Sequence, residues 1–135
     1  MDSIFLGTET PPPLQTLLRA PQLGEICDEF HRLHGVHARV ENADGELLAE
    51  ASDLHKLDDT HDHAPPDIEV GTEPAWTHCR CDARFLKVGI FNDLDRVGQL
   101  RVGPVPEPQA DAMKRETNLL GFMLSSLVYA SYQAF

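Results

Sequence analysis

The pair Asp44-Gly45 constrains the fold of this chain more than any other feature, because it is a tight-turn signal between two segments with strand patterns. Before the turn, apolar residues alternate with His37, Arg39 and Glu41 over residues 36–41, which is typical of a half-buried strand. After the turn, residues 46–52 continue as a second strand. The sequence therefore predicts a β-hairpin in the first half of the chain.

Three further strands are predicted in the second half. A polar turn over residues 92–95 joins residues 85–91 to residues 97–102, and residues 76–79 form a shorter strand before them. Pro104 then ends the sheet, because proline cannot donate a hydrogen bond to a neighbouring strand. Strands that return through hairpins rather than helical crossovers indicate an antiparallel sheet with helices on one face.

Two helices are predicted to flank this sheet. Apolar residues recur at helical spacing from Leu23 to Leu33, Pro21 suits a first helical turn, and Gly35 suits a left-handed cap. The second helix covers residues 108–135 and has a broad apolar surface. The predicted fold is α+β, with a PAS-like antiparallel sheet of about five strands, an N-terminal helix and a long C-terminal helix.

Length and charge limit the organisation and the partners. The chain has 135 residues, enough for one domain over residues 14–135, preceded by a flexible proline-ended arm over residues 1–13. A net charge of -11 makes nucleic-acid binding unfavourable. Residues 41–73 hold eleven of the acids and one base, Lys56, so this segment is predicted to be a solvated surface or a site for a basic protein partner.

Cysteine usage and hydropathy indicate a cytoplasmic protein. The chain has an odd number of cysteines, Cys27, Cys79 and Cys81, which does not suggest a disulfide framework. No export signal opens the sequence. Cys27 falls in a helical apolar stripe, where a cysteine usually behaves as a small buried hydrophobe. Polar residues interrupt the apolar stretch 119–135, so we expect a soluble helix there rather than a membrane span.

The segment His78-Cys79-Arg80-Cys81 combines imidazole and thiol groups that zinc or iron can bind. On a strand, residues 79 and 81 share one face and His78 points to the other, so the three converge only if the chain turns sharply. We expect buried thiols and no cofactor here. The alternatives are a metal or redox site at Cys79 and Cys81, or a cysteine nucleophile. Three histidines could complete a metal site: His55, His61 and His63.

A ligand pocket and a dimer interface are the two binding surfaces that the pattern suggests. Four large apolar residues could line a pocket between sheet and helices, with a filled core as the alternative. These residues are Trp76, Phe85, Phe91 and Leu100. The terminal helix suggests a homodimer seam, or else a chain cut before an output domain. The predicted interface residues are Met113, Leu120, Met123, Leu124 and Leu127.

The order of these motifs resembles that of a PocR-type sensory domain, a PAS-like bacterial module of transcription regulators and signalling proteins. The resemblance covers roughly residues 23–107. It rests on the helix from Leu23 to Leu33 with Gly35, the hairpin around Asp44-Gly45, and above all the segment that begins His78-Cys79-Arg80-Cys81 and ends at Phe85. The runs Gly98-Gln99-Leu100 and Gly103-Pro104-Val105 match the last part of the family's pattern. It implies a sensory role and binding of a small organic ligand.

We therefore expect a non-enzymatic cytoplasmic sensory module that forms a homodimer through its terminal helix. One alternative is a protein-interaction adaptor with a filled pocket, which binds through the acidic segment 41–73 or through the terminal helix. The other is a metal or redox sensor at Cys79 and Cys81. No nucleic acid and no membrane are expected as partners.

Overall fold

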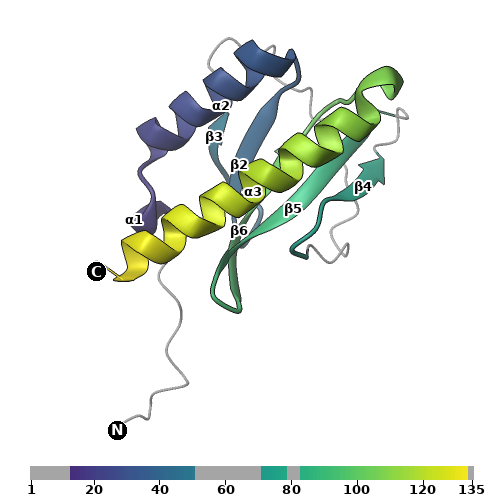
Figure 1. The fold of residues 1–135 in the computed structure, drawn as a ribbon. Coiled ribbons are helices and arrows are strands. Elements are labelled where there is room, and N and C mark those ends of the chain that lie inside the picture. The colour runs from purple at the N-terminus through teal and green to yellow at the C-terminus, as the bar shows by residue number, and fades with distance from the viewer. Residues whose placement is uncertain (1–12, 51–70, 79–82, 134–135) are drawn as a thin grey trace, which may run out of the picture.

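The structure is a computed structural model that describes residues 13–50, 71–78 and 83–133. It is an α+β fold, as predicted, with helices packed on a single sheet (Figure 1). The elements in chain order are α1 (Leu14–Leu17), α2 (Ala20–His34), β2 (Ala38–Asn42), β3 (Leu47–Glu50), β4 (Ala75–His78), β5 (Arg84–Asn92), β6 (Asp95–Val102), the 3-10 helix η3 (Glu107–Gln109) and α3 (Ala110–Gln133).

The sheet has five strands in the order β3-β2-β6-β5-β4, and all neighbouring strands are antiparallel. The last strand, β6, is the central strand and pairs with both β2 and β5, so that Leu100 lies opposite Val40 on one side and Val88 on the other. The predicted five-stranded antiparallel sheet is confirmed. Its order brings the first and second halves of the chain into direct contact.

The first hairpin forms where Asp44-Gly45 predicts it. Gly45 has φ 88°, a left-handed conformation that glycine adopts without steric cost. The side-chain oxygen of Asn42 accepts hydrogen bonds from the backbone N–H groups of Asp44 and Glu46, both at 2.9 Å. These bonds hold the turn closed and fix the pairing of β2 with β3.

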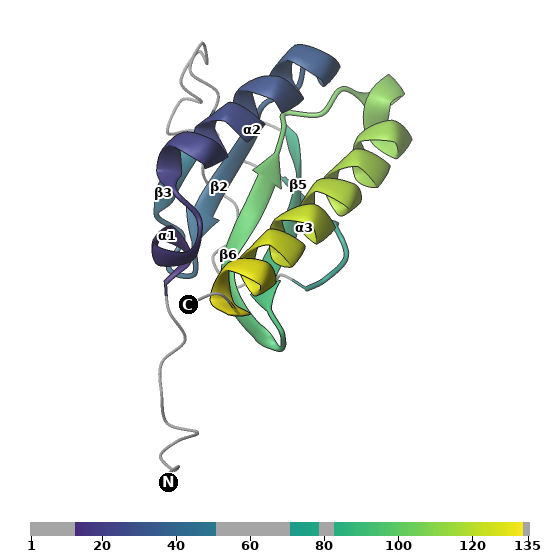
Figure 2. The same ribbon diagram turned by 60° about the vertical axis from the view of Figure 1, so that its left-hand side comes forward.

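Both long helices cover the same face of the sheet (Figures 1 and 2). α2 packs on β2 and β3, whereas α3 runs in the opposite direction along β5 and also contacts β6. The close approach of α3 depends on Gly121, because a Cβ atom there would lie 2.8 Å from a methyl carbon of Val88. The helix-facing side of the sheet is apolar, and its fully buried residues include Val40, Leu86 and Leu100.

The local signals of α2 work as the sequence suggests, with one exception. Pro21 lies in the first turn, and Gly35 ends the helix at φ 69° with its N–H bonded to the carbonyl of His31. Cys27 is fully buried in the apolar stripe, which confirms its prediction as a small buried hydrophobe. Leu33 is 61 % exposed, so its assignment to the stripe is wrong, because it lies at the edge of the face that α2 turns toward the sheet.

The strand β2 is buried on both faces, so the prediction of a half-buried strand is wrong. Arg39 and Glu41 face away from the helices, yet they are only 8 % and 1 % exposed. A carboxylate oxygen of Glu41 lies 3.5 Å from a guanidinium nitrogen of Arg101 and 3.9 Å from one of Arg39, and Gln99 donates a hydrogen bond to the other oxygen. Because the charged side chains of this face pair with one another across neighbouring strands, the cost of burying them is reduced.

Several predictions fall on residues outside the described part of the chain. They are the flexible arm, apart from Pro13, and most of the acidic segment, since residues 1–12 and 51–70 are not described. The short strand before the cysteines is β4 over Ala75–His78, and its predicted last residue, Cys79, lies outside the described residues. Within the described ranges, no helix is long and apolar enough to cross a membrane.

Candidate functional site

The four residues predicted to line a pocket do not converge on one. Trp76 lies opposite Leu86 and therefore on the helix-facing side of the sheet with Leu100, whereas Phe85 is on the other side. Phe85 and Leu100 are buried in packed parts of the structure. Of the four, Phe91 lines a groove that is described below.

Trp76 has a structural contact instead. The guanidinium carbon of Arg84 lies 4.6 Å from the centre of the Trp76 ring, a cation–π arrangement. The same guanidinium group is 2.6 Å from a carboxylate oxygen of Glu107 in η3. Arg84 thereby ties the edge strand β4 to the segment that leads into α3.

The metal and redox hypothesis centres on residues that the structure leaves largely undescribed. Cys79 and Cys81 lie outside the described residues, and His78 is known only as the last backbone position of β4. Among the residues that are described, no group of three or more His, Cys, Asp and Glu side chains is arranged to hold a metal. Burial, together with smaller contributions from the charges of Asp28 and Glu50, raises the pKa of the Cys27 thiol to about 12, so Cys27 is not an activated nucleophile.

The predicted dimer residues divide between two sides of α3. Met113, Leu120 and Leu124 are buried and pack within the core of one chain, so they are not available at a surface. Met123 and Leu127 are about half exposed. A surface for a partner on this helix must therefore include Met123 and Leu127 together with other residues of the exposed side.

The exposed side of α3 is apolar over most of its length, and we call it the outer face. The sequence has no charged residue from Thr117 to the end of α3 at Gln133. Six large side chains on this side are between 42 and 69 % exposed. They are Leu119, Phe122, Met123, Leu127, Tyr129 and Tyr132. An exposed apolar patch of this kind is typical of a contact surface.

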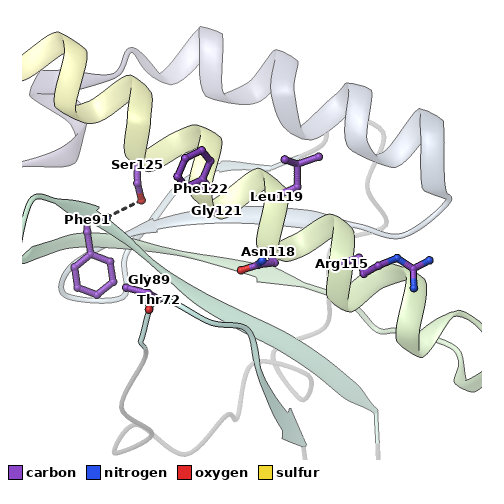
Figure 3. A pocket seen from close by; sticks show the side chains of 9 residues that line it. All are labelled: Thr72, Gly89, Phe91, Arg115, Asn118, Leu119, Gly121, Phe122 and Ser125. Atoms are coloured by element: carbon purple, nitrogen blue, oxygen red, sulfur yellow. Dashed lines mark hydrogen bonds between the residues drawn. The ribbon is translucent and has the colours of Figure 1, made fainter.

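A groove of about 460 Å³ lies beside α3, between that helix, the end of β5 and Thr72 (Figure 3). Its walls are apolar at Phe91, Leu119 and Phe122 and polar at Thr72, Arg115, Asn118 and Ser125. Figure 3 shows Arg115 and Ser125 toward opposite ends of the groove. Ten helical residues separate the two, which corresponds to about 15 Å along the helix axis.

Two backbone features shape this groove. The N–H of Phe91 donates a hydrogen bond to the hydroxyl oxygen of Ser125 at 3.0 Å, which fixes α3 against the end of β5 (Figure 3). The N–H of Gly89 bonds to the carbonyl of Gly71 at 2.8 Å, so the chain before β4 continues along β5 and forms the second wall. A Cβ atom at Gly89 would lie 2.5 Å from the Phe91 ring, so glycine lets that ring lie across the strand.

The groove continues past Arg115 into a more polar part. This extension has about 410 Å³ and is lined by Glu73, Pro74, Asp111 and Lys114, and it shares Arg115 and Asn118 with the first part. Arg115 therefore lies where an apolar channel meets a charged one. The volume of the apolar part is within the range of small-molecule sites, about 300–1,000 Å³.

A second polar cluster, which we call the charged row, crosses the face of the sheet away from the helices. Arg39 lies opposite Arg101, and Arg101 lies opposite Lys87, so three cations occupy neighbouring positions on β2, β6 and β5. All three are at least nine-tenths buried. Because like charges opposite one another are destabilising, the carboxylate of Glu41 in the adjacent position has a central electrostatic role here.

Comparisons of the chain with protein families, with curated proteins and with solved structures found no match.

Sequence reasoning missed the polar side of the groove. Arg115 and Asn118 belong to the polar run of residues 114–118, which is typical of any solvent-facing helix turn, and Thr72 is far away in sequence, so no local pattern joins them as a site. One signal was present for the apolar side. Charges stop after Glu116 while large apolar residues continue, and this change in composition marks the part of α3 that combines the groove with the outer face.

Proposed function

We propose that this protein is a non-enzymatic regulatory domain that works as a homodimer, with the outer face of α3 as the contact between the two copies. The observation that carries the proposal is the uncharged outer face, with six large exposed side chains on a chain of net charge -11. The resemblance to PocR-type sensory domains favours the same kind of role, and a cytoplasmic location is part of the proposal.

The size of the outer face is compatible with a pair of identical chains. Half-exposed large side chains offer roughly 100 Å² each, so six of them give about 600 Å² per copy and about 1,200 Å² in a symmetric pair. This total is at the lower end of the range for stable interfaces. A self-complementary helix face buries the same residues on both chains, as two-fold symmetry requires.

Charge favours a second copy approaching through this face. Two chains of net charge -11 repel each other through most of their surfaces. Between Thr117 and Gln133, α3 contributes no charge to that repulsion. Contact through the outer face therefore brings apolar side chains together while the acids of the two copies stay at the edges.

A regulatory role follows from the way the outer face and the groove share residues. Leu119 and Phe122 line the groove and also belong to the outer face. A molecule in the groove contacts side chains that would form the dimer, so occupancy of the groove and dimerisation become linked, each affecting the affinity of the other. The groups that the groove presents are a guanidinium, an amide and hydroxyls, which suit binding and orientation.

Met123→Glu tests the proposed dimer. Light scattering on wild-type protein should give twice the 15.0 kDa mass of one chain, whereas the variant should be a monomer, because it places two carboxylates in an apolar contact. Leu94→Glu is the matched control, since Leu94 is 88 % exposed in the β5–β6 turn and should leave the mass unchanged. A wild-type monomer, or a Met123→Glu dimer as stable as wild type, would contradict the proposal.

A further inference from the structure

We infer that the groove beside α3 binds an organic carboxylate with an apolar body, whose carboxylate pairs with Arg115. The inference rests on the proposed binding function of the domain and names the class of ligand. Three observations support it: the position of Arg115 at one end of the apolar channel, the apolar walls beyond it, and a volume suited to a small molecule.

Arg115 supplies the recognition group for the carboxylate. It is exposed, and among the described residues its guanidinium group takes part in no ion pair and no hydrogen bond. A guanidinium group binds a carboxylate through two parallel hydrogen bonds, and Asn118, one helical turn further on, can donate a third. Glu73 and Asp111 line the polar extension on the other side of Arg115. The negative charges of these acids would repel a carboxylate placed deeper in that extension. The body of the ligand therefore lies along the apolar part of the groove.

The apolar channel sets the size of that body. From Arg115 to Ser125 the channel runs about 15 Å along α3, with Phe122 and Leu119 on the helix side and Phe91 on the strand side. Phe122 is 69 % exposed, so its ring is available to pack on a ligand and the core of the domain need not change. An aromatic ring on a short alkyl chain fits these dimensions, and its burial against the apolar walls of the groove would drive binding.

The probe 4-phenylbutyrate tests the inference, with 4-phenylbutanol and 4-phenylbutylamine as its neutral and cationic analogues. Titration of the full chain by ligand-detected NMR should show binding of the carboxylate at least about tenfold tighter than of either analogue, because only the carboxylate pairs with the guanidinium. Arg115→Gln should weaken 4-phenylbutyrate binding about tenfold and remove its advantage over the alcohol. Arg19→Gln, at the start of α2 and outside both parts of the groove, should change the affinity less than about twofold, because an exposed charge that makes no direct contact contributes little.

Three results would overturn the inference: no binding of 4-phenylbutyrate to wild-type protein, equal affinity for the carboxylate and the alcohol, or equal losses in Arg115→Gln and Arg19→Gln. Failure of the proposed dimer is a separate result, because the mass of the wild-type chain is measured without the probe. A monomer that still distinguishes Arg115→Gln from Arg19→Gln would support the groove and contradict the dimer. Phe122→Ala should weaken both the carboxylate and the alcohol, since it removes the apolar wall that both contact.

Discussion

Replacing Leu124 with alanine is expected to lower the free energy of unfolding by about 3 kcal/mol, within the range of about 2–5 kcal/mol for buried leucines. Leu124 is fully buried at the centre of α3, on the side that packs against the sheet. The truncation removes apolar contacts and leaves a cavity between helix and sheet, which the close contact of Gly121 with Val88 prevents from collapsing.

Urea denaturation at constant protein concentration measures this effect. Leu33→Ala is the matched control, because Leu33 is also a helical leucine but is largely exposed, and it should cost less than about 1 kcal/mol. Similar losses for the two variants would mean that α3 does not pack on the sheet through Leu124. The buried side of the helix would then be assigned wrongly.

Replacing Glu41 with glutamine is expected to lower the free energy of unfolding by about 3 kcal/mol, even though the side chain keeps its shape. Glu41 is 1 % exposed and is within 4 Å of the guanidinium groups of Arg39 and Arg101. The amide removes one of the negative charges that offset the repulsion along the charged row, another being the Glu50 carboxylate 3.9 Å from Arg39, and it leaves the buried cations less well compensated.

The same denaturation measurement applies, with Glu29→Gln as the control. Glu29 pairs with Arg32 on the exposed side of α2, where solvent screens the interaction, so its replacement should hardly change the urea midpoint. An unchanged midpoint for Glu41→Gln would show that the charged row does not depend on this carboxylate.

The elements that could be predicted from sequence are those with local causes. Asp44-Gly45 determines its turn through backbone conformations that are available to glycine, and Gly35 ends α2 for the same reason. Alternation and helical spacing identify the strands and helices to within a few residues. The hairpins then imply antiparallel pairing, and the fold class follows.

Burial on the second face of the sheet could not be predicted in this way. Alternation places Arg39 and Glu41 on the face of the strand away from the apolar residues, and it predicts that these two side chains are exposed to solvent. Their burial depends on Arg101, Gln99 and Lys87, which come from strands more than forty residues away in the sequence. Charge pairing across strands is a property of the strand order, and no local pattern contains it.

The face of α3 is a similar case. Apolar residues surround most of this helix, so spacing alone does not separate the side that meets the sheet from the side that meets a partner. The predicted interface consequently mixes buried Leu120 and Leu124 with exposed Met123 and Leu127. Contact of Gly121 with Val88 and the hydrogen bond from Phe91 to Ser125 orient the helix, and both depend on β5.

Isotope-filtered NMR on an equal mixture of ¹³C-labelled and unlabelled chains tests the pairing of α3 helices most directly. Magnetisation transfer between labelled and unlabelled chains arises only across an interface between copies. We predict contacts from the methyl groups of Met123 and Leu119 to aromatic protons of Phe122 or Tyr129 in the other copy. Transfer confined to residues outside α3, or no transfer at all at concentrations where the chain is intact and folded, would contradict a homodimer built on the outer face.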